Sequence, residues 1–343
     1  MKYFIYIALI LTTFVSCEND IPFNANNNTP KLIINTLLDS SKKENEIILA
    51  ITGRDKTSNV KDAVIDIYVN GILKEHITQP TQNTTSKGYS SYITRISFVP
   101  QDIIRIDVKA NGGEYFAWAE ASAPHPIAIE NIEIDEYTKQ ASNWGSSGQY
   151  VKAQTTFTDN RQGINYYRIA MNFDFEVETV SPYDEKDTLI FQTVVSDLIV
   201  DEDLVLTDGQ PSVSNNDIYT PVYNEYGVFD NSRINGTYTM TTSMQVPYYY
   251  AGITDSWYNM SYYESLKKVK AKVRVKLMSI SKDQYMYLKA LNIYDSEDYD
   301  DYFNLPVKFP SNINGGTGIF GISTVNESLI SLKDYIPENK YVK

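Results

Sequence analysis

Short runs of alternating apolar and polar residues dominate the chain from residue 31 onward. Such runs, rich in Ile, Val, Tyr and Thr, are typical of half-buried β-strands, because successive side chains of a strand point to opposite faces. Asn70-Gly71 lies between two of them and predicts a hairpin with a type I′ turn. We therefore expect residues 31–124 to form an immunoglobulin-like β-sandwich. Its seven predicted strands are residues 31–38, 45–52, 63–69, 72–78, 90–99, 102–110 and 114–123.

The same pattern continues after Pro124-His125-Pro126, a stiff segment that predicts a domain boundary. One helix is predicted to begin at Ser281, capped by Ser281 or Asp283, with apolar residues at helical spacing. These residues are Tyr285, Leu288, Leu291 and Tyr294. The sequence therefore predicts a mainly β protein, whose larger second β domain (residues 127–332) carries one short helix. Its predicted strands are residues 127–137, 150–159, 165–180, 187–195, 236–246 and 267–280, and a polar tail follows at 333–343.

The N-terminus has the pattern of a lipoprotein signal peptide. Lys2 supplies a positive charge, residues 3–15 are mostly apolar, and small Ser16 stands directly before Cys17. An apolar run of about 13 residues is too short to span a bilayer as a helix, so residues 1–16 are interpreted as a cleaved secretory signal. The ending resembles a lipobox, although Phe14 stands where leucine is usual. We expect Cys17 to carry lipid; an ordinary signal with an incidental cysteine is the alternative.

Cys17 is the only cysteine, so no disulfide within the chain is expected. Residues 17–30 are polar and rich in Asn, which predicts a flexible tether between lipid and fold. Glu18 and Asp20 resemble the signal that exports Bacteroidetes-type lipoproteins to the cell surface, or are simply part of the tether. No later run reaches the ~18 apolar residues of a membrane-spanning helix. The predicted location is the outer membrane, by lipid anchor, and the cell surface rather than the periplasmic face.

The charge of the chain argues against nucleic-acid binding. The formal net charge is −13, and phosphate contacts need clustered Lys and Arg. Binding flat on an anionic membrane is disfavoured for the same reason.

Common catalytic motifs are missing from the sequence. The only histidines are His76, in a predicted strand, and His125, between two prolines, and neither has a recognisable nucleophile motif beside it. Gly316-x-Gly318-x-x-Gly321 matches the dinucleotide fingerprint formally, but a strand-like segment follows it where a helix is required. We interpret these glycines as a turn that packs closely against neighbouring backbone. No catalytic residue, nucleotide or other cofactor is predicted.

The layout resembles a family of Bacteroidetes outer-membrane lipoproteins known as domain of unknown function 4249. The resemblance covers roughly residues 17–332: an anchored start, an immunoglobulin-like domain with its Asn-Gly hairpin, and a larger β domain. Its most specific part is the segment 310–321, with Asn312, Gly315, Gly316, Gly318, Phe320 and Gly321. The family has no established catalytic residues. Because its members are often encoded beside TonB-dependent receptors, the resemblance implies a role in uptake or surface binding.

Two acidic stretches contain the carboxylates that a cation site needs. The first offers five carboxylates without the spacing of an EF-hand loop: Asp295, Glu297, Asp298, Asp300 and Asp301. It is a weak candidate for Ca²⁺, and a solvated loop after the helix is the favoured alternative. The second stretch, residues 197–208, is expected to be solvated in the same way.

One predicted strand places five cations on a single face. They are Lys268, Lys270, Lys272, Arg274 and Lys276, and they alternate with apolar residues. Like charges two residues apart repel, so acidic neighbours on adjoining strands are expected to pair with them. The other interpretation is a docking stripe for an anion or a partner.

Tyrosine is unusually frequent, with 28 residues. Many lie in a region, about 197–260, for which no structure is predicted. A tyrosine ring suits interfaces and sugar stacking, although strand-rich chains also favour it for structure. The candidate ligand-binding residues are Tyr223, Tyr226, Tyr248, Tyr249, Tyr250, Trp257 and Tyr258.

The sequence favours a non-catalytic outer-membrane lipoprotein that binds a nutrient or assists a TonB-dependent receptor. The alternatives are a surface adhesion or assembly subunit, which pairs through an exposed strand edge, and a carboxylate-dependent hydrolase.

Overall fold

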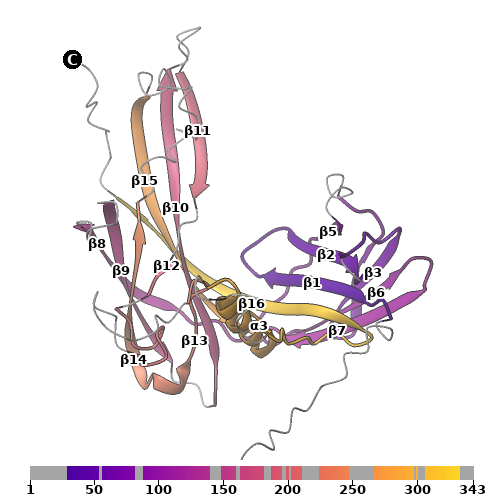
Figure 1. Cartoon of the computed structure of the whole chain (residues 1–343). Helices are drawn as coiled ribbons and strands as arrows, with labels where there is room; N and C mark the ends of the chain where they lie inside the picture. The colour runs from indigo at the N-terminus through magenta and orange to yellow at the C-terminus, as the bar shows by residue number, and fades with distance from the viewer. Residues whose placement is uncertain are drawn as a thin grey trace, which may run out of the picture.

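Figure 1 shows a computed structural model of the chain. It describes residues 29–53, 56–81, 88–139, 148–159, 163–180, 187–194, 198–200, 202–210, 224–246, 266–296, 299 and 306–332. Within these ranges the backbone alone is described at residues 137–139, 148–149, 177–180, 187–192, 194 and 266–269. The fold is mainly β, as predicted, and begins with an immunoglobulin-like sandwich.

The first seven strands follow the predicted runs closely. In β1 and β3, buried and partly exposed residues alternate along the whole strand, as the sequence pattern requires. Asn70 and Gly71 have φ values of 52° and 76° between the antiparallel strands β3 and β4, which confirms the predicted hairpin. The strands are β1 (Leu32–Asp39), β2 (Asn45–Ile51), β3 (Ala63–Val69), β4 (Ile72–Ile77), β5 (Ser90–Thr94), β6 (Ile103–Ala110) and β7 (Tyr115–Ser122).

The second half contains longer strands and the predicted helix. Helix α3 (Lys282–Tyr294) has Ser281 as its N-cap, and Tyr285 and Leu288 are buried. The strands and the short helix η3 are β8 (Ile129–Lys139), β9 (Gly148–Asp159), β10 (Tyr166–Val180), β11 (Asp187–Val194), β12 (Leu198–Ile199), β13 (Val228–Asp230), η3 (Asn231–Arg233), β14 (Gly236–Gln245), β15 (Leu266–Ile280) and β16 (Gly316–Ser331). β12, β13 and η3 lie in the stretch for which no structure was predicted.

The described strands form three sheets. The long sheet has the order β11-β10-β15-β16-β1-β2-β5, with β13 also paired to β10. A second sheet, β4-β3-β6-β7, covers the β1–β2 end of the long sheet, and a third, β12-β14-β9-β8, lies beside its β10–β15 end (Figure 1). The long sheet therefore runs through both halves of the chain.

β16 joins the two halves. Its first residues, 316–323, pair in parallel with β1, and residues 323–331 pair antiparallel with β15. Figure 1 shows it as one continuous strand that crosses from the first sandwich to the second part. Phe320 and Ile322 belong to the first core although they lie far beyond Pro124 in the sequence. The domain boundary at 124–127 stays a prediction, and the first sandwich contains a strand from outside residues 31–124.

Close packing explains the glycines that precede and begin β16. Gly318 has φ +111°, and a Cβ at this position would lie against the carbonyl oxygen of Ile34 in β1. At Gly315, with φ +76°, a Cβ would lie 2.6 Å from the carbonyl oxygen of Phe116 in β7. A side chain fits neither position. The expected close packing against neighbouring backbone is therefore confirmed, but Gly316, Gly318 and Gly321 lie within β16 itself and not in a turn before it.

Three clusters of apolar side chains form the core. The first fills the sandwich between β1, β2 and the second sheet. The second fills the space between β10, β15 and the third sheet, around Phe157 and Phe173. The third lies beneath α3, where Tyr285 and Leu288 contact Met278 and Ile280 of β15.

The prediction that residues 197–208 are a solvated acidic stretch is wrong for Asp203, which is buried. Its side chain is 3% exposed. The carboxylate accepts hydrogen bonds from the backbone N–H groups of Val205 and Thr241, at 2.9 and 2.8 Å, and from the Tyr238 phenol at 3.1 Å. A buried carboxylate is tolerated when such donors surround it. Asp203 therefore holds its own turn against β14.

Candidate functional site

The predicted cationic stripe lies on the outward face of β15. Val273, Val275 and Leu277 are fully buried, while the charged residues between them are partly exposed. Carboxylates on the two neighbouring strands meet these cations. The Cα partners of Lys270 and Lys272 in β10 are Glu176 and Asp174. This register brings opposite charges together across the sheet.

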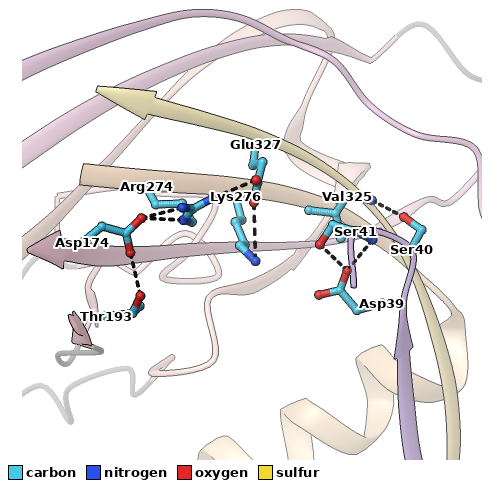
Figure 2. A network of polar contacts seen from close by, with 9 residues as sticks. All are labelled: Asp39, Ser40, Ser41, Asp174, Thr193, Arg274, Lys276, Val325 and Glu327. Atoms are coloured by element: carbon cyan, nitrogen blue, oxygen red, sulfur yellow. Dashed lines mark hydrogen bonds and ion pairs between the residues drawn. The ribbon is translucent and has the colours of Figure 1, made fainter. Parts of the chain in front are cut away.

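Ion pairs neutralise most of the described stripe, as Figure 2 shows for Arg274 and Lys276. Arg274 contacts Asp174 at 2.5 Å and Glu327 of β16 at 2.8 Å. Lys276 lies 3.5 Å from the same Glu327. Hydrogen bonding to Asp174 is the main cause that raises the pKa of Arg274. The arrangement is the cross-strand pairing that the sequence analysis offered as an alternative to docking.

Of the two remaining described cations, Lys270 is paired with a described residue and Lys272 is not. Lys270 contacts Glu176 at 2.5 Å. Lys272 makes no ion pair with another described residue, and the side chain of Lys268 lies outside the described part. Docking of a partner on this stripe stays a prediction.

Two residues from different candidate sites contact each other. The phenol of Tyr226 donates a 2.6 Å hydrogen bond to Asp295, the residue that follows α3. Arg168 donates from Nε to the carbonyl oxygen of Tyr226 at 2.9 Å. The backbone N–H of Tyr226 donates to the side-chain oxygen of Asn292 at 3.1 Å. Burial first, and then the Asp295 carboxylate, raise the pKa of Tyr226 to about 12. Tyr226 thus fastens its loop to β10 and α3.

The other predicted site residues lie outside the described residues. They are Cys17, Tyr223, Tyr248, Tyr249, Tyr250, Trp257, Tyr258, Glu297, Asp298, Asp300 and Asp301. In the part that is described, no group of three or more His, Cys, Asp or Glu side chains is placed to hold a metal ion.

The two histidines occupy different environments. His76 lies on the outer face of β4, with Nδ1 2.6 Å from Asp66 Oδ1 on β3. His125 lies at the edge of a cavity between the two halves of the molecule.

This junction cavity has a volume of about 530 Å³. One wall is the end of β7 with the segment that follows it, and the other is the start of β10. The floor is formed by the end of β15 and the first turn of α3. Small-ligand sites usually have volumes of about 300–1,000 Å³, and they often lie at the junction between two structural units. The junction cavity is therefore the candidate functional site.

Hydrogen bonds with β16 fix one wall of the junction cavity. Thr324 donates to the carbonyl oxygen of Pro124 at 3.0 Å, and Asn326 accepts from the N–H of Ile129 at 3.2 Å. The connecting segment is thus held against the strand that joins the two halves. β16 therefore fixes the wall formed by this segment, while the start of β10, the other wall, pairs with β13 and β15.

The closing glycine-rich segment also reaches this cavity. Asn312 donates to Asp283 at 3.1 Å and to the carbonyl oxygen of Phe320 at 2.8 Å, and accepts from the N–H of Phe320 at 2.9 Å. Asp283 lines the floor of the cavity. The most specific residues of the sequence resemblance therefore position one of its polar groups.

Ser279 lies in the cavity floor and is 2% exposed. Its hydroxyl has no hydrogen-bond partner among the described residues. Tyr166 lines one wall, and its ring lies 4.7 Å from that of Tyr285 between centroids. Sequence reasoning missed this site, because its residues come from segments far apart in the chain. The only signal was the stiff segment at Pro124, which was interpreted as a boundary.

The fold and this cavity define a mainly β protein of two packed β units, with a ligand-sized cavity where they meet. The chain belongs to the family described as domain of unknown function (DUF4249), whose model matches residues 18–328. The family resemblance seen in the sequence is thereby confirmed. No curated protein matches the chain. Among the described residues, no helix combines the length and the apolar character needed to cross a membrane.

Proposed function

We propose that the protein is a non-catalytic, lipid-anchored protein of the outer membrane that binds a small nutrient in the junction cavity and assists a TonB-dependent receptor. The observation that carries the proposal is the cavity itself, which has the volume of a small-ligand site and lies where the two β units meet. The signal-like residues 1–16 and the lone Cys17 support the anchor.

Fatty-acid labelling in the native host tests the anchor. The wild-type chain is expected to incorporate the label and to sediment with outer membranes. Cys17→Ser should lose both properties, because no other thiol is present to accept lipid. A wild-type product without label, found in the aqueous fraction, would contradict the proposed location.

Recovery of partners from native membranes tests the receptor role. The tagged chain is expected to co-purify with an outer-membrane transporter after mild cross-linking. An unrelated lipoprotein with the same tag serves as the control. Repeated purification without any transporter would count against this part of the proposal and leave ligand binding to be judged separately.

A second candidate, a surface assembly subunit, is favoured by the edge of the long sheet. Among the described strands β11 pairs only with β10, so its other edge has no described strand beside it. Figure 1 shows β11, β10 and β15 reaching beyond the third sheet. Such an edge can add a strand from another chain. Oligomers that grow with concentration in sedimentation experiments would support assembly, and a monomer at all concentrations would exclude it.

A further inference from the structure

We infer that the junction cavity binds a neutral saccharide, an inference that rests on the ligand-binding part of the proposed function. The charges of the lining carry the first step. Lys282 and Asp283 are its only Lys, Arg, Asp or Glu residues, they are neighbours in α3, and their charges cancel. The lining thus has no excess of either sign to attract a ligand with net charge, which favours a neutral ligand.

Polar side chains in the lining that lack a described hydrogen-bond partner further support a saccharide ligand. The side chains of Gln101, Ser122 and Tyr166 line the cavity and make no hydrogen bond with another described residue. An amide, a hydroxyl and a phenol each both donate and accept hydrogen bonds. Sugar hydroxyls do the same, so this set matches a ligand whose polar groups are hydroxyls.

The ring of Tyr166 carries the third step. It lies against Tyr285, with 4.7 Å between the ring centroids and 35° between the planes. Tyr285 belongs to the core beneath α3, so the platform for Tyr166 is fixed. A fixed tyrosine gives a flat apolar surface at little entropic cost, which suits the C–H face of a sugar ring.

The volume and the floor are consistent with one ligand of modest size. About 530 Å³ accommodates a mono- or disaccharide rather than a long glycan. Ser279 lies in the floor, and its buried hydroxyl has no hydrogen-bond partner among the described residues. A ligand whose hydroxyl reaches Ser279 supplies that partner.

Binding of a saccharide panel to the full-length mature protein tests the inference. The protein is purified in a detergent without a sugar headgroup, which would otherwise compete. The panel holds neutral mono- and disaccharides, matched uronic acids, and free amino acids with dipeptides. Binding is measured by saturation-transfer NMR and confirmed by titration calorimetry. We expect at least one neutral saccharide to bind and the charged compounds to fail.

Ser122→Trp provides the decisive variant, because Ser122 is exposed, ends β7 and lines the cavity. A tryptophan there fills the space and should weaken saccharide binding at least tenfold. Ser331→Trp is the matched control, since Ser331 is also exposed and ends a strand, β16, away from the cavity. The control should bind as the wild type does.

Three other outcomes of the binding experiment would contradict the inference. Binding of amino acids, dipeptides or uronic acids alone would overturn the saccharide inference and leave the proposed binding function intact. Saccharide binding that Ser122→Trp does not weaken would place the site elsewhere and overturn the inference. Failure of every compound class to bind would overturn both the inference and the role of the cavity in the proposed function.

Discussion

The phenol of Tyr226 donates a 2.6 Å hydrogen bond to Asp295 and so joins the loop before β13 to the end of α3. The sequence had placed these residues in two separate candidate sites, one for a ligand and one for a cation. In the structure both serve to fix the helix against β10. The same loop residue also accepts a hydrogen bond from Arg168.

The raised pKa of Tyr226, caused first by burial and then by its hydrogen bond to Asp295, predicts a loss of stability at alkaline pH. The pKa of Tyr226 is raised from the usual 10.0 to about 12 in the folded chain. The folded state thus favours the protonated phenol, so the stabilisation is complete below pH 10 and is lost as the pH rises from about 10 to about 12. Urea unfolding at a series of pH values measures it.

Tyr226→Phe isolates this contribution. The variant should have a free energy of unfolding lower by about 1 kcal/mol at pH 8, because one hydrogen bond is missing. The difference from the wild type should shrink above pH 10, since only the wild type has at this position a phenol that ionises in the unfolded chain while it stays protonated in the folded one. Tyr294→Phe, at a residue 45% exposed, serves as the control. A difference that stays constant up to pH 12 would show that the pKa of Tyr226 is not raised.

The strands of this protein could largely be predicted because their signal is local. In β1 and β3 every second side chain is buried, and all of these core positions except Thr36 are apolar, so the alternation indicates a strand directly. The Asn70-Gly71 turn and the Ser281 cap are equally local, since each depends on the conformation or hydrogen bonds of a few neighbouring residues. The sequence predicts acidic partners for the cationic stripe, but not their positions in β10 and β16.

The role of β16 could not be predicted because it depends on distant pairing. Nothing in residues 316–323 indicates that they will lie in parallel beside β1, almost three hundred positions earlier. The junction cavity follows from this pairing, so its residues carried no pattern of their own. Asp203 was misjudged for the same reason, because donors that bury it come from β14.

Gly318 offers a test of the close contact between β16 and β1. Gly318→Ala should lower the free energy of unfolding by about 3 kcal/mol, because a Cβ would be forced against the carbonyl oxygen of Ile34 at a positive φ. Gly112→Ala is the matched control: its φ is +67°, but no atom lies within 4 Å of the added Cβ. It should cost about 1 kcal/mol. Equal losses in urea unfolding would contradict the proposed close packing.

The paired stripe predicts unequal effects for two neighbouring cations. Arg274→Gln should cost about 1 kcal/mol, because Asp174 and Glu327 then lose the cation they share. Lys272→Gln, two residues away on the same face, should change stability by less than about 0.5 kcal/mol. The loss for Arg274→Gln should also shrink at about 1 M salt. A larger loss for Lys272→Gln would show that the stripe is stabilised by contacts other than these ion pairs.

The hydroxyls of Thr155 and Ser279 are buried and have no hydrogen-bond partner among the described residues. Thr155 is fully buried in the second core, and Ser279 lies in the cavity floor. Burying an unpaired hydroxyl is unfavourable, so Thr155→Val and Ser279→Ala should each raise the free energy of unfolding by about 1 kcal/mol. Thr36→Val is the control, since Thr36 is as deeply buried but donates to the carbonyl oxygen of Glu46 at 2.8 Å. It should lower stability by about 1 kcal/mol. If Ser279→Ala behaved like Thr36→Val while Thr155→Val stabilised, the Ser279 hydroxyl would have a partner in the free protein, and its availability to a ligand would be lost.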